Sequence, residues 1–261
     1  MDTKMMPALF IGHGSPMNVL ENNRYTRLWT KLGETLPQPK AILVISAHWY
    51  TEGTFATAMS QPKTIHDFYG FPPELYEIEY PAKGSISLVA LIEDLINPIP
   101  LKLDMDQWGL DHGSWGILEK MYPNANIPVV QLSIDMRQSA QWHYELGQKL
   151  IELRREGVLI IGSGNVVHNL RMMDWQNDNS EPYPWALSFS KTVENALQSE
   201  EKPEILFDIL STEEGHLAHP TPEHFIPVLS LLGLRNENEK VTLLNNDIIN
   251  KSLSMMTFQV G

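Results

Sequence analysis

Unbroken apolar runs of strand length are the feature of this sequence that most restricts its fold. Four such runs contain few polar residues and cover residues 8–11, 41–45, 128–134 and 158–161. A strand that is buried on one face alternates apolar and polar residues, whereas a strand that is buried on both faces is almost continuously apolar. We therefore expect a mostly parallel sheet with helices on both faces.

Amphipathic segments between these runs supply the expected helices. Apolar residues return every three or four positions, the spacing of a helix with one buried face, over residues 25–36, 85–96, 139–156, 185–198 and 222–232. Ser139 and Thr221 stand where N-caps are expected, and Pro222 follows at the first helical position, which proline favours. The runs at 241–244 and 252–260 alternate more, which predicts edge or antiparallel strands.

The length and the connections favour a single domain over residues 1–261. A chain of this size suits one large α/β domain. Proline marks several connections, but none is long enough to be a flexible interdomain linker, and no repeat period is found. The sequence thus predicts an α/β fold, in which one domain has a central, mostly parallel sheet flanked by helices.

Charge and cysteine content exclude several kinds of partner and site. The 19 Lys and Arg residues against 32 Asp and Glu residues give a formal charge of -13, which would repel a phosphate backbone, so no nucleic-acid partner is expected. The chain has no cysteine, which rules out disulfides, thiolate metal sites and a cysteine nucleophile.

No stretch reaches the roughly 18 apolar residues of a membrane span, and the N-terminus lacks the apolar run of a signal peptide. We predict a soluble, cytoplasmic protein without a membrane partner.

Three histidines lie where predicted strands end. His13 follows the first run, His48 the second, and His168 the fourth after a Gly-Ser-Gly turn. Because ligands of open α/β sheets bind beyond the carboxyl ends of the strands, these histidines are expected to meet in one crevice. His112 and His224 lie in segments rich in glycine or proline and are further candidates. Three histidines, or two with a carboxylate, can hold zinc or iron and leave positions open for a substrate, so the sequence predicts an open metal site.

Other histidines have simpler explanations. His66 lies in an aromatic loop, where packing accounts for it almost as well as a pocket does. His143, beside a tryptophan in a predicted helix, and His216 are expected to be structural or solvated.

Six short motifs, spread over residues 12–224, surround the histidines in a fixed order. They are Gly12-His13-Gly14-Ser15-Pro16-Met17, Ser46-Ala47-His48-Trp49, His66-Asp67-Phe68, Asp111-His112-Gly113-Ser114-Trp115, Gly164-Asn165-Val166-Val167-His168-Asn169-Leu170 and His219-Pro220-Thr221-Pro222-Glu223-His224. Together they resemble the class III extradiol ring-cleavage dioxygenases of the LigB type, and within these the 4,5-DOPA dioxygenase branch. The resemblance implies one α/β catalytic domain with a single metal ion in a pocket at the carboxyl ends of the strands.

The resemblance also implies roles for individual histidines. His13 and His48 match the two metal-binding histidines of the family. His168 matches its acid/base histidine, and His112 matches a pocket histidine that contacts the substrate or dioxygen. His168 is also a candidate ligand, as the fourth member of a histidine tetrad in a zinc-loaded form.

The third metal ligand stays open at this point between two neighbours. More distant relatives supply a glutamate, whereas the DOPA-type branch uses the final histidine of the last motif, which is His224 here. Glu223 directly precedes it. Because neighbours at the start of a helix point about 100° apart, both residues are not expected to bind the same ion.

The reaction that the resemblance implies is extradiol cleavage of a catechol such as DOPA by O₂ at one divalent ion. A base must remove a hydroxyl proton and an acid must later return one, and a histidine that titrates near neutrality can do both. Zinc has no redox chemistry, so Fe(II) is expected for ring cleavage, with zinc as an ion that the same site can bind. The alternatives are a zinc-dependent hydrolase and a non-catalytic metal-binding protein of the same fold. The chain is expected to be a monomer or a small homo-oligomer.

Overall fold

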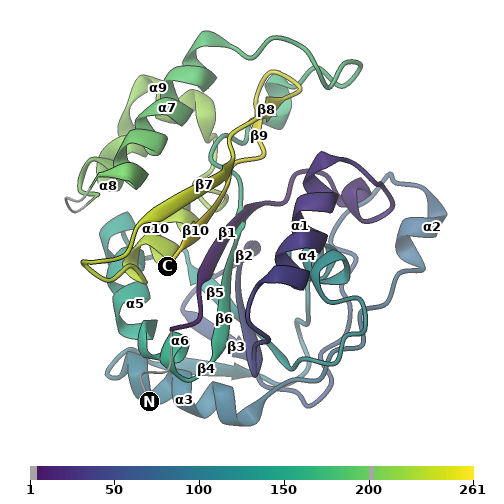
Figure 1. The fold of residues 1–261 in the computed structure, drawn as a ribbon, viewed down its shortest axis with the longest axis vertical. Helices are drawn as coiled ribbons and strands as arrows, with labels where there is room; N and C mark the ends of the chain where they lie inside the picture. Colours follow the sequence, from purple (N-terminus) through teal and green to yellow (C-terminus); the bar gives the residue numbers. More distant parts are fainter. Residues whose placement is uncertain (1–4, 200–202) are drawn as a thin grey trace.

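An eight-stranded sheet runs through the middle of the molecule in the order β4-β3-β5-β2-β6-β1-β10-β7 (Figure 1). The computed structural model describes residues 5–199 and 203–261, so part of the N-terminal segment that bears on the signal-peptide prediction lies outside it. The strands are β1 Ala8–Gly12, β2 Ala41–Thr51, β3 Thr54–Thr57, β4 Leu101–Asp104, β5 Val129–Asp135, β6 Val158–Gly164, β7 Val241–Asn245 and β10 Thr257–Val260. A separate two-stranded sheet pairs β8 Ile248–Ile249 with β9 Leu253–Ser254.

The four apolar runs form the parallel centre of the sheet, as predicted. β5, β2, β6 and β1 are neighbours, and each pairs in parallel with the next. β10 is antiparallel to β1, and β7 is antiparallel to β10 at the edge, which confirms the prediction for the last two runs. The run at 252–260 is broken into β9 and β10, however, and the short strands β3, β4 and β8 were not predicted.

Helices cover both faces of the sheet, which explains why the central strands are apolar at successive positions. On one face, α1 (Arg24–Thr35) and α4 (His112–Met121) form a core with Leu9 and other side chains of the same strand face. On the other, α3 (Ile86–Ile96), α5 (Ala140–Leu150) and α10 (Ile226–Gly233) form a core with Phe10. The fold class predicted from the sequence is confirmed.

The remaining helices are short, apart from α7, and lie outside these two layers or at their edges (Figure 1). They are α2 Pro73–Tyr76, α6 Glu152–Arg155, α7 Pro184–Gln198, α8 Ile205–Asp208 and α9 Glu213–Ala218, with 3₁₀ turns η1 Pro16–Val19, η2 Leu170–Met172 and η3 Ile209–Ser211. Among the described residues, no helix has the length and apolarity needed to cross a bilayer.

Two of the helix predictions differ from the structure. The segment at 139–156 forms two helices, α5 and α6, although Ser139 is the N-cap as predicted and accepts a hydrogen bond from the amide of Trp142 at 3.2 Å. The prediction that Thr221 caps the last long helix is wrong. α10 begins at Ile226 because the carbonyl of His224 accepts the amide of Asn165 at 3.0 Å instead of entering the helix.

Arg154 ties both ends of the described chain to the sheet. Its side chain is fully buried, makes a two-pronged ion pair with Glu239 at 2.6 and 2.7 Å, and donates to the carbonyls of Met6 and Leu234 at 2.7 and 2.6 Å. Its removal would leave a partly buried carboxylate and buried carbonyls without partners. Arg154→Met is therefore expected to lower the free energy of unfolding by about 3–5 kcal/mol, measured by urea denaturation.

The neighbouring Arg155 provides a matched control for this prediction. It pairs with Glu152 at 3.4 Å, and both side chains are more than half exposed. Arg155→Met is expected to cost less than about 1 kcal/mol, as exposed pairs do. Equal urea midpoints for the two variants would contradict the role assigned to Arg154.

Candidate metal centre

His13 follows β1, and a hydrogen bond at one ring nitrogen orients its side chain. Its Nδ1 lies 3.0 Å from the hydroxyl oxygen of Ser163, which itself donates to the carbonyl of Gly113 at 2.6 Å. Because that donation uses the only hydroxyl proton, Ser163 must accept a hydrogen bond from His13 Nδ1. We therefore assign the proton of the neutral ring to Nδ1, which leaves Nε2 of His13 with a free lone pair.

His48 lies within an extended strand rather than directly after its end, which corrects the predicted strand boundary. β2 runs to Thr51, but its pairing with β6 stops at Ser46 and its pairing with β5 is interrupted until Tyr50. Nδ1 of His48 lies 3.3 Å from a carboxylate oxygen of Asp67. A carboxylate only accepts hydrogen bonds, so the neutral ring is protonated at Nδ1, and its Nε2 is free.

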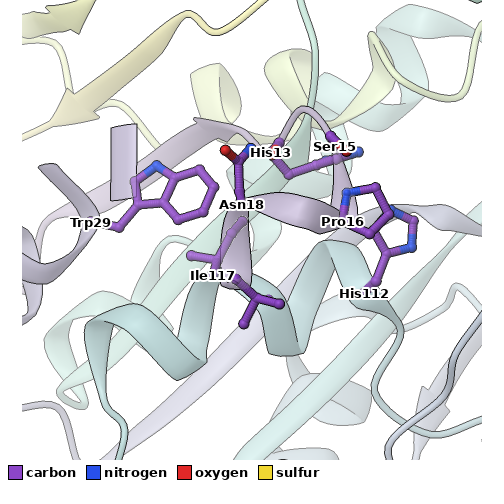
Figure 2. Close-up of a pocket in the computed structure, with 9 residues that line it drawn as sticks. His13, Ser15, Pro16, Asn18, Trp29, His112 and Ile117 are labelled. Carbon is purple, nitrogen blue, oxygen red and sulfur yellow. Dashed lines mark hydrogen bonds between the residues drawn. The ribbon is translucent and has the colours of Figure 1, made fainter. Parts of the chain in front are cut away.

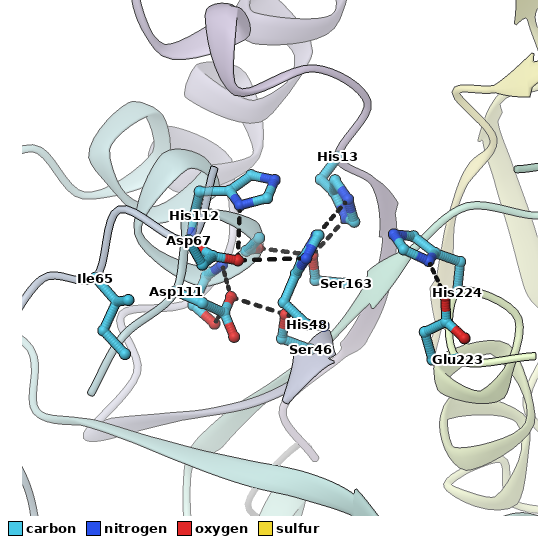
Figure 3. Close-up of polar contacts among 12 residues, drawn as sticks. His13, Ser46, His48, Ile65, Asp67, Asp111, His112, Ser163, Glu223 and His224 are labelled. Atoms are coloured by element: carbon cyan, nitrogen blue, oxygen red, sulfur yellow. Dashed lines mark hydrogen bonds and ion pairs between the residues drawn. The ribbon is translucent and has the colours of Figure 1, made fainter. Parts of the chain in front are cut away.

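The free nitrogens of these two histidines face each other. Nε2 of His48 lies 3.1 Å from Nε2 of His13 (Figure 3). Two lone pairs at this distance repel each other unless a cation lies beside them. Two nitrogens that bind one ion at about 2.1 Å, at right angles to each other, are about 3.0 Å apart, so the spacing suits a shared metal ion.

His224 completes a set of three rings with the same arrangement. Its Nδ1 lies 3.2 Å from Glu223 Oε1, and its buried Nε2 has no hydrogen-bond partner. The ring centroid lies 5.4 Å from that of His13 and 5.1 Å from that of His48. Buried polar atoms almost always have a partner, and a metal ion would supply one for this nitrogen.

The protonation states of these rings also suit a metal. Burial is the main cause that lowers the pKa of His13, His48 and His224 well below the usual range, and neighbouring histidines lower it further. All three are therefore neutral at pH 7, the form that binds metals. Each is oriented through Nδ1 by an oxygen acceptor, as ligating histidines generally are. The donor set fits one divalent ion.

His112 lies close to the same centre, although the sequence placed it in a loop. It is the first residue of α4, whose N-cap is Asp111. The candidate ligand atoms of His13, His48 and His112 all lie within 4.8 Å of one another. By this distance His112 is better placed than His224, which does not belong to the group, to reach a metal ion bound between His13 and His48.

Asp67 links two of these histidines, a role that was not predicted for it from its motif. Its Oδ2 accepts from Nδ1 of His112 at 3.0 Å and lies 3.3 Å from Nδ1 of His48, while Oδ1 accepts the amide of His112 at 2.8 Å (Figure 3). Burial raises its pKa, but the hydrogen bonds and charges of the two histidines outweigh burial and lower the pKa to about 2. Asp67 is therefore ionised at all ordinary pH values.

His168 stacks on the ring of His224. The two rings are nearly parallel, at an angle of 6°, with centroids 3.5 Å apart. The backbone of His168 is fixed by a hydrogen bond to the carbonyl of Ala218 at 2.9 Å and by a bridge to Leu253. Burial, followed by the charge of His112, lowers the pKa of His168 to about 4, so its neutral form prevails at pH 7, and it titrates below the neutral range expected from the sequence.

A small cavity lies against His13 and His112 on the side of α1 and α4 (Figure 2). It measures about 10 Å³ and is bounded by Trp29, Asn18 and Ile117 among others. This is roughly the space that one water molecule needs. An aromatic ring does not fit there, so this cavity is not the place of a catechol ring.

Three other histidines occupy structural or solvent-exposed positions. His66 donates a hydrogen bond from Nε2 to the carbonyl oxygen of Ile78 at 3.0 Å, and its ring packs on Trp115. His143 is buried and bonded to the carbonyl of Asp135 at 3.2 Å. His216 is exposed on α9. None of the three faces the metal centre.

Comparisons with known proteins identify the family and several relatives of this chain. A family profile described as the catalytic LigB subunit of aromatic ring-opening dioxygenase matches residues 7–257. The 4,5-DOPA dioxygenase extradiol of Escherichia coli (strain K12) is 54% identical over 263 residues, which cover 100% of this chain and 97% of that protein. A protein of the same name from Beta vulgaris is 39% identical and covers 91% of this chain and 90% of its own length. A crystal structure of an uncharacterised protein from Escherichia coli K12 superposes with a TM-score of 0.87 at 51% identity, covering 98% of this chain and 100% of that one.

Proposed function

The chain belongs to the LigB family of extradiol ring-opening dioxygenases, and from this premise we propose that it opens the ring of a DOPA-type catechol with O₂ by 4,5-cleavage. The observation that carries the proposal is the pair of free Nε2 atoms of His13 and His48, 3.1 Å apart, with the ring of His224 beside them and that of His168 stacked on it. We also propose that residues 1–261 form one catalytic domain. We further propose a monomer or a small homo-oligomer.

We propose that His13, His48 and His224 hold the metal. The buried, unpartnered Nε2 of His224 supports this choice over His112, and Glu223 then acts as the acceptor that orients His224 rather than as a ligand. A bound divalent ion supplies open coordination positions for substrate oxygens and, if it is Fe(II), redox chemistry that zinc lacks. We therefore propose Fe(II) as the working ion and zinc as one that occupies the same site without turnover.

His168 is the proposed acid/base residue. Its ring is neutral at pH 7 because of its lowered pKa, so a nitrogen lone pair is available to accept a proton from a catechol hydroxyl beside it. Stacking on His224 holds the ring at the edge of the metal centre. Once protonated, the same nitrogen can return the proton to an oxygen of the opened product.

His112 is the proposed donor to charge that develops on oxygen. Its Nδ1 lies 3.0 Å from the ionised carboxylate of Asp67, which fixes the ring beside the ligand atoms of His13 and His48. When Nε2 carries a proton, it is a hydrogen-bond donor to an oxygen at this centre. A fixed donor of this kind favours a negatively charged oxygen over a neutral one.

The proposed function is tested by oxygen uptake with protein loaded anaerobically with Fe(II). We expect L-DOPA to consume one O₂ per molecule and to give a yellow ring-opened product, and zinc-loaded protein to consume none. Absence of O₂ uptake with any catechol would overturn the proposal. Zinc-dependent turnover of an ester or amide in the absence of O₂ would point instead to a hydrolase.

A further inference from the structure

A hollow of about 360 Å³ lies between the start of α1 and the segment after η2. Its lining includes Ser15, Asn18 and Arg24 on one side, and Trp175 and Asp178 on the other. Pockets that bind small molecules measure roughly 300–1,000 Å³. The hollow is therefore large enough for part of a substrate, unlike the cavity between His13 and α4.

The walls of this hollow lie close to the metal centre, because Ser15 and Asn18 also line the small cavity against His13. Ser15 is two residues beyond His13, and the side-chain amide of Asn18 donates to the carbonyl of His13 at 2.9 Å. Leu253, which also lines the hollow, pairs with His168 through an isolated β-bridge. The hollow thus lies next to both the proposed ligand His13 and the proposed acid/base residue His168.

Arg24 gives the hollow a cation with spare hydrogen-bond donors. Its guanidinium lies over the ring of Tyr25 at 4.9 Å, and its Nη2 donates to the hydroxyl of Tyr25 at 2.7 Å and pairs with Asp247 at 3.1 Å. Both polar contacts use Nη2, so Nε and Nη1 have no partner among the described residues. The side chain is 57% exposed, and each of these two nitrogens can donate a charge-assisted hydrogen bond to a carboxylate.

Acidic side chains on the same lining complement a cation. Asp178 is exposed, and its Oδ1 accepts from the side-chain amide of Asn250 at 2.8 Å, which orients the carboxylate. Glu21, also exposed, is a second carboxylate on the lining. A group with one positive and one negative charge therefore finds partners of both signs within one hollow.

We propose that this hollow binds the α-amino acid end of the substrate, with Arg24 on the carboxylate and Asp178 on the ammonium group. The inference rests on the proposed function, because it places the catechol ring at the metal centre and the side chain in the adjoining hollow. The exposed indole of Trp175, at the rim, packs on the methylene between ring and amino acid. The preferred substrate is thus a catechol that carries a zwitterionic side chain.

The test compares four catechols on the Fe(II)-loaded enzyme: L-DOPA, dopamine, 3,4-dihydroxyphenylpropionate and 4-methylcatechol. Arg24→Gln is expected to lower kcat/KM about 10-fold, relative to 4-methylcatechol, for the two substrates with a carboxylate. Asp178→Asn is expected to do so for the two substrates with an ammonium group. Anaerobic calorimetry is expected to give matching increases in Kd.

Arg27→Gln, on the next turn of α1, and Asp94→Asn, on α3, are the matched controls. Both residues are exposed and neither lines the hollow, so the selectivity ratios are expected to stay at the wild-type values. If the kcat/KM ratios of Arg24→Gln and Asp178→Asn stayed within twofold of wild type, the proposed subsite would be wrong. Turnover of 4-methylcatechol by these variants would still support ring cleavage as the function. No O₂ uptake with any of the four catechols would overturn the proposed function itself.

Discussion

His13→Ala and His48→Ala are each expected to yield protein without bound metal, whereas His168→Ala is expected to keep the metal and lose turnover. Each of the first two changes removes a nitrogen of the pair that lies 3.1 Å apart. The third removes a ring that stacks on His224 and is the proposed base, a function worth roughly 10²–10⁴-fold in rate. Metal content of the purified variants, measured together with O₂ uptake, separates the two classes.

The same measurement decides the third ligand. His224→Ala is expected to lose the metal, and His112→Ala to retain it with reduced turnover, because Nε2 of His224, unlike that of His112, is among the fully buried atoms without a hydrogen-bond partner. His216→Ala, at an exposed position on α9, is the control and keeps both metal and activity. If His112→Ala lost the metal and His224→Ala retained it, His112 would be the third ligand and His224 would not. Equal behaviour of His13→Ala and His168→Ala would contradict the division between ligand and base.

The parallel centre of the sheet could be predicted because strands that are buried on both faces have continuously apolar sequences. Leu9 and Phe10 are neighbours, yet they contribute to different cores, so no polar position interrupts the run. β4 could not be found in this way, since its short segment Leu101–Asp104 is mostly exposed or half-buried and lacks a periodic pattern. α4 was missed because its first residues resemble a glycine-rich turn, and only the cap by Asp111 reveals a helix.

Of the candidate site, only the histidines could be predicted from the sequence, because several of them lie near the ends of predicted strands. His13 and His168 lie at such ends, and the family resemblance supplied their expected roles. The acceptors that orient the rings left no comparable signal. Asp67 is 45 residues from His112 and Ser163 is 150 residues from His13, and these contacts depend on how loops pack over the sheet. A single aspartate in an aromatic loop does not reveal such contacts without the fold.

Asp67→Asn is expected to weaken metal binding about 10- to 100-fold, the usual effect of removing a partner that orients a ligating histidine. Asp67 uses one oxygen towards Nδ1 of both His48 and His112, and its other oxygen accepts the amide of His112. Asparagine has one oxygen acceptor, and its NH₂ group must then face an N–H donor. Titration against a competing chelator measures the change in Kd without relying on turnover.

Asp104→Asn is the matched control for this change. Asp104 is also buried, but its carboxylate accepts only backbone amides of its own turn, from Asp106, Gln107 and Trp108. It is expected to leave the Kd of the metal unchanged even if it lowers stability, so thermal unfolding of both variants separates loss of folding from loss of orientation. A metal Kd within twofold of wild type in Asp67→Asn would mean that Ser163 and Glu223 suffice to fix the ligands. Weakened binding in a folded Asp67→Asn protein would instead show that the negative charge and both acceptor oxygens of Asp67 are needed to present His48 to the ion.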